Sequence, residues 1–106
     1  MFVVRIFKRC QREIADFPDE ARADLADLVA RLDSGLKLSM PISRPMPSIG
    51  KGVHELRLKD RSGIYRVIYV FLGQSDIWLL HGFKKKAQAT PHQNIELAQK
   101  RLKELL

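Results

Sequence analysis

Basic side chains in the second half of the chain are the residues that could do chemistry, because they recur on neighbouring predicted strands. One stretch covers residues 52–69 and contains Arg57 and Arg66, and another covers residues 81–91 and contains the lysine triplet 84–86. Arginine binds phosphate through a planar fork, whereas lysine acts as a point charge. Together these residues predict a compact surface for phosphate-rich ligands.

RNA is the phosphate-rich ligand on which such a surface could act chemically. RNA carries its own nucleophile, the 2′-hydroxyl group, which can attack the adjacent phosphate. That attack needs in-line alignment, stabilisation of the charge on the phosphorane, and proton transfers. Arginine and lysine can supply the electrostatic stabilisation, and histidine, tyrosine or glutamate can transfer the protons.

The sequence shows no familiar motif for a metal or a cofactor. The three histidines, Cys10 and the acidic residues lack metal-ligand spacing. The second half lacks the clustered carboxylates of a two-metal nuclease, and the chain has no glycine-rich nucleotide loop. We therefore expect no metal and no cofactor, so that any cleavage would be metal-independent.

Each candidate also has an ordinary structural interpretation. Arg57 and Lys59 fit the solvated face of a half-buried strand, and Arg66 fits a structural salt bridge, for example to Glu55 on the neighbouring strand. A charge run such as the lysine triplet 84–86 is usually just solvated. These alternatives stay open at the level of sequence.

Size and charge narrow the class of protein. The chain has 106 residues, which predicts one domain over residues 1–106, and its formal net charge is +7. The second half holds 11 of the 19 basic residues but only 5 of the 12 acidic ones. This bias favours nucleic acid, an anionic membrane surface or an acidic protein as partner. The sequence shows neither an apolar run of about 18 residues, the length of a membrane span, nor an apolar leader, so we expect a protein that does not enter the membrane. Cys10 is the only cysteine, which fits a reducing cytoplasm. We therefore expect a cytoplasmic protein.

Apolar periodicity predicts the elements that would position the basic side chains. β-branched and aromatic runs indicate strands, and apolar residues at helical spacing indicate helices. Residues 35–52, with three prolines and three glycines, should form a loop. The predicted elements are a strand over 2–7, helices over 10–17 and 19–34, strands over 53–59, 64–72 and 77–84, and a final helix from Pro91.

The order of these elements predicts an α+β fold. Short turns at 60–63 and 73–76 imply that the last three strands form an antiparallel meander. The final helix should begin with a capping box in which Thr90 is the N-cap and Gln93 is at N3. The expected arrangement is β-α-α-β-β-β-α, a single antiparallel sheet with an N-terminal helical hairpin and a C-terminal helix packed on it.

Beyond these patterns, the chain resembles a known family. The order E-L-R at 55–57, Y-R at 65–66, H-G-F-x-K-K at 81–86 and T-P at 90–91 is similar to that of the phage-derived, HigB-type branch of the RelE/ParE toxin superfamily. The resemblance covers roughly residues 2–105, and it implies a RelE-like fold.

The resemblance also implies a function. Members of this superfamily are toxins of type II toxin–antitoxin pairs, and the RelE and HigB branches cleave mRNA on the ribosome without a metal. It implies a small helix-turn-helix antitoxin as partner and allows a heterotetramer with it. Other members, of the ParE type, inhibit DNA gyrase and are not nucleases, so a gyrase inhibitor or a relic that only binds its antitoxin is the alternative.

The resemblance places candidate site residues in the second half of the chain. The catalytic candidates are Glu55, Arg57, Arg66, Lys84 and His92. The RNA-binding candidates are Lys51, Lys59, Arg61, Lys85 and Lys86. Several relatives use a tyrosine or histidine near the C-terminus for proton transfer, whereas this chain ends in Glu104-Leu105-Leu106. His92 is the nearest candidate for that role.

Overall fold

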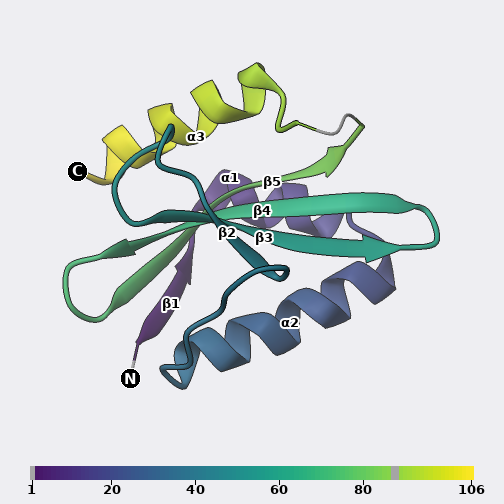
Figure 1. The fold of residues 1–106 in the computed structure, drawn as a ribbon, viewed down its shortest axis with the longest axis horizontal. Coiled ribbons are helices and arrows are strands. Elements are labelled where there is room, and N and C mark those ends of the chain that lie inside the picture. The colour runs from purple at the N-terminus through teal and green to yellow at the C-terminus, as the bar shows by residue number, and fades with distance from the viewer. Residues whose placement is uncertain (1, 87–88) are drawn as a thin grey trace.

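A mixed β-sheet forms the centre of the computed structural model, which describes residues 2–86 and 89–106 (Figure 1). Its five strands lie in the order β1-β5-β4-β3-β2. The elements along the chain are β1 (Val3–Ile6), α1 (Lys8–Ala15), α2 (Asp19–Asp33), β2 (Ser43–Pro45), β3 (Val53–Asp60), β4 (Gly63–Leu72), β5 (Asp76–Lys85) and α3 (His92–Leu105).

The predicted α+β fold and its meander are confirmed. Strands β3, β4 and β5 pair antiparallel in sequence order, and each of their ends lies within one residue of the predicted position. The expectation of a wholly antiparallel sheet is wrong, because β1 pairs in parallel with β5. The helices α1 and α2 separate β1 from the meander, so no tight turn forces β1 to run antiparallel to its neighbour.

A short strand also forms where the sequence predicts only a loop. β2 pairs antiparallel with β3, and Arg44 lies opposite Glu55 in the register. Pro45 can occupy this strand because β2 lies at the edge of the sheet, where a missing backbone N–H costs no ladder hydrogen bond. The edge strand brings a basic residue from the loop next to the meander.

Helices cover both faces of the sheet (Figure 1). One apolar core packs side chains of α1 and α2 against the sheet, including Cys10, Leu25 and Leu56, and another packs α3 against the opposite face through Ala98 and Leu102. Burial, and then the charge of Glu13, raises the pKa of the Cys10 thiol to about 12. Cys10 is therefore a buried residue that behaves as an apolar side chain. No helix in the described part of the chain is long and apolar enough to cross a membrane.

The start of α3 differs from its prediction. The N-cap is Pro91, and no side chain among the described residues caps the helix, so the predicted capping box with Thr90 and Gln93 is wrong. Instead the Thr90 hydroxyl donates a hydrogen bond of 2.7 Å to Oε2 of Glu55. Thr90 thus ties the segment before α3 to strand β3, beside the predicted basic surface.

Candidate functional site

The strand register brings the predicted arginines together on one face of the sheet. Arg57 on β3 lies opposite Arg66 on β4, and Lys59 lies opposite Ile64. Ile64 in turn lies opposite Lys85 on β5. Because residues directly opposite in a sheet project to the same side, Arg57, Arg66 and Lys85 share the α3 face. They lie toward the β3–β4 turn, which extends beyond α3 in Figure 1.

A single carboxylate lies among these basic side chains. The Glu55 side chain is fully buried, and its Oε1 is 3.4 Å from Nε of Arg66. Because the Thr90 hydroxyl donates to Oε2, one carboxylate oxygen of Glu55 faces a hydrogen-bond donor and the other faces a positive charge. Arg66 is 5% exposed and donates from Nη1 to the carbonyl of Tyr65 at 3.2 Å. The ion pair anticipated between Arg66 and Glu55 is therefore present, as a charge contact in which neither atom has a hydrogen-bond partner among the described residues.

The group formed by Arg44, Arg57, Arg66 and Lys85 around Glu55 is called the cationic cluster below. Burial, and then the charges of Arg57 and Arg44, lowers the pKa of Arg66 against the opposing effect of Glu55. Burial and the charge of Arg66 likewise lower the pKa of Lys85 from its ordinary 10.5. Four basic side chains thus crowd around one carboxylate, and an anionic ligand would relieve their mutual repulsion.

A groove lies beside the cluster. It has a volume of about 370 Å³. Its lining includes Arg57, Lys59 and Arg66 together with the apolar side chains of Pro41, Ile42, Leu58 and Ile64. The groove gives a ligand direct access to two of the clustered arginines.

The lysine triplet 84–86 divides between the two faces. Lys85 is 8% exposed and belongs to the cationic cluster. Lys84 is exposed on the opposite face, with its Nζ 6.0 Å from the ring centroid of Tyr65. Lys86 is exposed just beyond the end of β5. The structure therefore brings Lys85 into the cluster and leaves Lys84 outside it.

The remaining predicted residues lie at different distances from the cluster. Lys59 lines the groove, and Arg61 is exposed in the β3–β4 turn. Lys51 precedes β3 and so lies at the opposite end of that strand, roughly 25 Å from Lys59 at the usual rise per residue. His92 is 82% exposed in the first turn of α3, and its Nε2 is 2.7 Å from Oε1 of Glu96. The structure does not bring Lys51 or His92 into the cluster.

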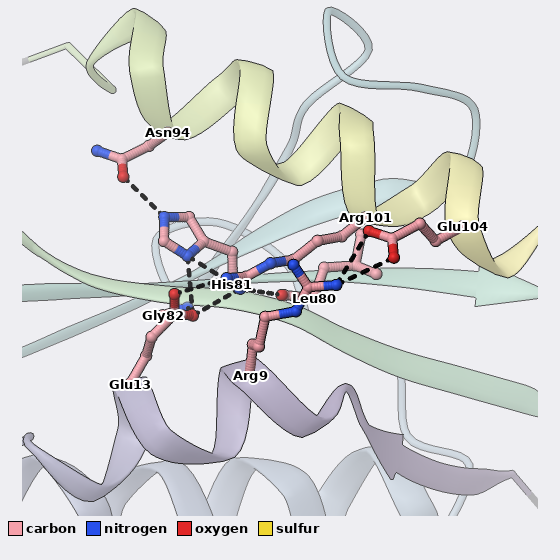
Figure 2. Close-up of polar contacts among 8 residues, drawn as sticks. All are labelled: Arg9, Glu13, Leu80, His81, Gly82, Asn94, Arg101 and Glu104. Carbon is pink, nitrogen blue, oxygen red and sulfur yellow. Dashed lines mark hydrogen bonds and ion pairs between the residues drawn. The ribbon is translucent and has the colours of Figure 1, made fainter.

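A second polar group, the Glu13 network, lies between α1, β5 and α3 (Figure 2). Both oxygens of Glu13 accept hydrogen bonds from Arg101, at 2.8 and 2.9 Å. Oε1 of Glu13 also lies 2.9 Å from Nδ1 of His81 and accepts from the Gly82 backbone N–H at 3.0 Å. Nε2 of His81 is 2.7 Å from Oδ1 of Asn94. The network therefore fastens α1 and α3 to the same strand.

Gly82 makes this close approach possible. A Cβ atom at position 82 would lie 3.2 Å from Cζ of Phe17 and 3.3 Å from Cγ1 of Ile14. Those distances are tight for any larger side chain. The glycine lets α1 approach β5 closely enough for Glu13 to accept the strand's own N–H group.

Glu13 should make the fold sensitive to acid. Burial alone would raise its pKa, but hydrogen bonds from His81, Arg101 and the Gly82 N–H outweigh burial and lower the pKa from 4.5 to about 2. Because the pKa of Glu13 is lower in the folded chain than in the unfolded chain, the ionised carboxylate stabilises the fold at pH values above about 4.5. This contribution, roughly 3 kcal/mol, is lost as the pH falls from about 4.5 through about 2. Urea unfolding of the wild type and of Glu13→Gln should show a stability difference that is constant above pH 5 and shrinks below it. A difference that stays constant down to pH 2 would contradict this expectation.

Sequence reasoning missed several members of these two groups. Arg44 lies in a proline-rich segment that gives no strand signal, and Thr90 was interpreted as a helix cap. Glu13 and Arg101 are 88 residues apart, so no spacing rule could join them. The one available signal is His81, a polar residue within the apolar part of β5. A polar side chain at a buried position needs hydrogen-bond partners, so His81 indicates that such partners lie nearby.

Comparisons with known proteins agree with this architecture. A family model described as "Phage derived protein Gp49-like" matches residues 12–103. Among solved structures, the isolated E. coli RelE toxin aligns over 100% of both chains with a TM-score of 0.59 and 16% sequence identity. No curated protein matches the chain. At this identity the structural likeness shows a shared RelE fold.

Proposed function

We propose that this chain, which belongs to the phage-derived Gp49-like family, is the toxin of a type II toxin–antitoxin pair and cleaves mRNA on the ribosome. The observation that carries the proposal is the cationic cluster, which lies on the fold of the RelE toxin and beside an open groove. A protein that only bound another protein would have no need of an arginine such as Arg66 buried within a strand, where its desolvation is costly.

The cluster suits cleavage by the RNA's own 2′-hydroxyl group. Arg57 and Arg66 would hold the scissile phosphate and stabilise the negative charge that grows on it in the transition state. Lys59 would contact a neighbouring phosphate from the groove. Glu55, which is buried and paired, would act as a positioning residue that orients the Arg66 guanidinium. The electrostatic part of the reaction then needs no metal.

The same charge distribution suggests how the toxin is controlled. The partner would be a helix-turn-helix antitoxin with an acidic segment that covers the cationic cluster, in an assembly such as a heterotetramer. Complementary charge would favour this pairing and speed its formation. Both proteins would meet in the cytoplasm, where the ribosome-bound mRNA is found.

Arg57 offers a clean test, because its side chain is partly exposed and its one described hydrogen-bond partner is the Met40 sulfur at 4.0 Å. In primer extension on an mRNA in a reconstituted translation system, we expect ribosome-dependent cuts with the wild type. Arg57→Ala should lower the cleavage rate about 100-fold, as for loss of one transition-state donor. Arg31→Ala removes the same charge from an exposed position on α2 and should leave the rate unchanged.

The outcomes separate the competing functions. Cuts that do not depend on Arg57 would remove the cationic cluster from the mechanism. Absence of cuts with wild type, together with a DNA-damage response and filamentation on induced expression, would favour a gyrase inhibitor. Absence of both effects would favour a relic that only binds its antitoxin.

A further inference from the structure

RNA cleavage by the 2′-hydroxyl requires a group that accepts its proton, and the arginines of the cluster cannot do so. Arg44, Arg57 and Arg66 stay protonated in proteins and can contribute charge alone. Glu55 is fully buried, its Oε2 accepts a hydrogen bond from Thr90, and its Oε1 faces the Arg66 guanidinium at 3.4 Å, so the carboxylate is held as the ion-pair partner of Arg66. The proton acceptor must therefore come from another residue that faces the cluster.

The described tyrosines and histidines do not fill this position. Tyr65 and Tyr69 belong to the core under α1 and α2, and their hydroxyl groups are 2.7 and 2.6 Å from the hydroxyls of Ser62 and Ser43. His54 stacks on Tyr69, on that same face of the sheet. His81 has both ring nitrogens engaged, by Glu13 and Asn94.

Lys85 is the remaining titratable side chain of the cluster. It lies diagonally across β4 and β5 from Arg66, on the same face of the sheet, and it is 8% exposed. The charged groups that face it are Arg66 on β4, Glu55 and Arg57 on β3, and Arg44 on β2. Three of these four are cationic, and burial, followed by the charge of Arg66, lowers the pKa of Lys85 against the opposing charge of Glu55. Both effects favour a neutral amine, which can accept a proton.

We propose that Lys85 is the general base of the site. This inference rests on the proposed function. The neutral Nζ removes the proton from the 2′-hydroxyl, and the 2′-oxygen forms a bond to the adjacent phosphorus. The bond from phosphorus to the 5′-oxygen breaks, and the 5′-oxygen takes a proton from water. The products are a 2′,3′-cyclic phosphate and a 5′-hydroxyl, and the Lys85 ammonium returns its proton to the hydroxide.

A test of this role must change the proton affinity of the side chain while keeping its length. Lys85→Arg keeps a long basic side chain that cannot lose its proton, so single-turnover cleavage of ribosome-bound mRNA should fall at least 100-fold. Lys37→Arg, an exposed position after α2, makes the same exchange outside the cluster and should cleave at the wild-type rate.

The decisive variant replaces the lysine by an analogue of lower pKa. In a Cys10→Ala background, Lys85→Cys can be alkylated with bromoethylamine in the unfolded state and refolded, which gives a thioether analogue of lysine. Cys10 is the chain's only cysteine, so the product is uniform. We expect the unmodified Lys85→Cys protein to be inactive. The alkylated protein should cleave, and its rate should reach a plateau at lower pH than in Cys10→Ala alone.

Each outcome decides one claim. A Lys85→Arg protein that cleaves like wild type, or an alkylated protein whose pH profile is unmoved, would overturn the role of Lys85 as base and leave the nuclease proposal intact. If wild type and Cys10→Ala both fail to cleave mRNA, the proposed function itself is wrong. Restored cleavage with the displaced profile would establish proton transfer by this side chain, because a purely structural lysine would not move the profile.

Discussion

Replacing Arg66 by alanine should both abolish mRNA cleavage and destabilise the fold. The guanidinium would stabilise charge on the phosphate, so its loss should lower the cleavage rate about 100- to 1000-fold. It is also the partner of Glu55, whose side chain is fully buried. Removing one member of a buried pair leaves the other charge uncompensated, at a cost of about 3–5 kcal/mol. Stability from urea unfolding and rate from single-turnover cleavage would measure the two effects.

A second variant separates the two effects of Arg66. In the double variant Glu55→Gln with Arg66→Gln, neither side chain carries a charge, so most of the stability lost in Arg66→Ala should return. Cleavage should stay about 100- to 1000-fold lower than in the wild type, because the Arg66 guanidinium no longer faces the phosphate. A double variant that folds and cleaves at the wild-type rate would show that Arg66 is only a structural partner of Glu55. Glu55→Gln alone should lower cleavage less than Arg66→Ala does, because Arg66 is kept and loses only the carboxylate that orients it.

The centre of the site follows from local rules, which explains why the sequence predicts it. Short turns between β3, β4 and β5 force antiparallel neighbours, and alternation then puts Glu55, Arg57 and Arg66 on one face. No relation between distant parts of the chain is needed for this step. The prediction of these three residues as close neighbours is confirmed, while their roles in cleavage remain proposals.

The choice among the lysines of the triplet depends on finer geometry. A shift of one residue moves every side chain of a strand to the other face, and the β4–β5 ladder contains such an irregularity at Ile68 and Tyr69. Counting from the start of β5 therefore does not give the face of Lys84 or Lys85. Only the pairing beyond the irregularity, with Ile64 opposite Lys85, places Lys85 beside Arg66.

Arg44 and the Glu13 network depend on contacts that no local pattern encodes. The strand that carries Arg44 has three residues and exists because β3 offers it a partner. The network joins α1 to α3 across β5, through a close approach that Gly82 allows. Such contacts are set by how the helices pack after the sheet has formed, so they become visible only in the folded structure.

The chain offers its own control for the strength of the Glu13 network, because two Arg–Glu pairs join α1 to α3. Glu13 and Arg101 form the inner pair, with side chains 25% and 5% exposed, and Arg9 and Glu104 form the outer pair, with side chains 50% and 43% exposed (Figure 2). Arg101→Met should destabilise the protein by about 3–5 kcal/mol, since Glu13 would lose its bidentate partner in a desolvated place. Arg9→Met should cost about 1 kcal/mol or less, because water screens the outer pair.

Urea unfolding of the two variants at pH 7 would compare the inner and outer pairs directly. Adding Glu13→Gln to Arg101→Met should recover part of the loss, because it removes the uncompensated carboxylate. Equal costs for Arg9→Met and Arg101→Met would show that burial does not strengthen the inner pair. A large cost for Arg101→Met alone would show that the inner pair is the stronger of the two links between α1 and α3, the helix that follows the Thr90 tether to Glu55. Arg101→Met should then also slow cleavage, although Arg101 has no place in the cationic cluster.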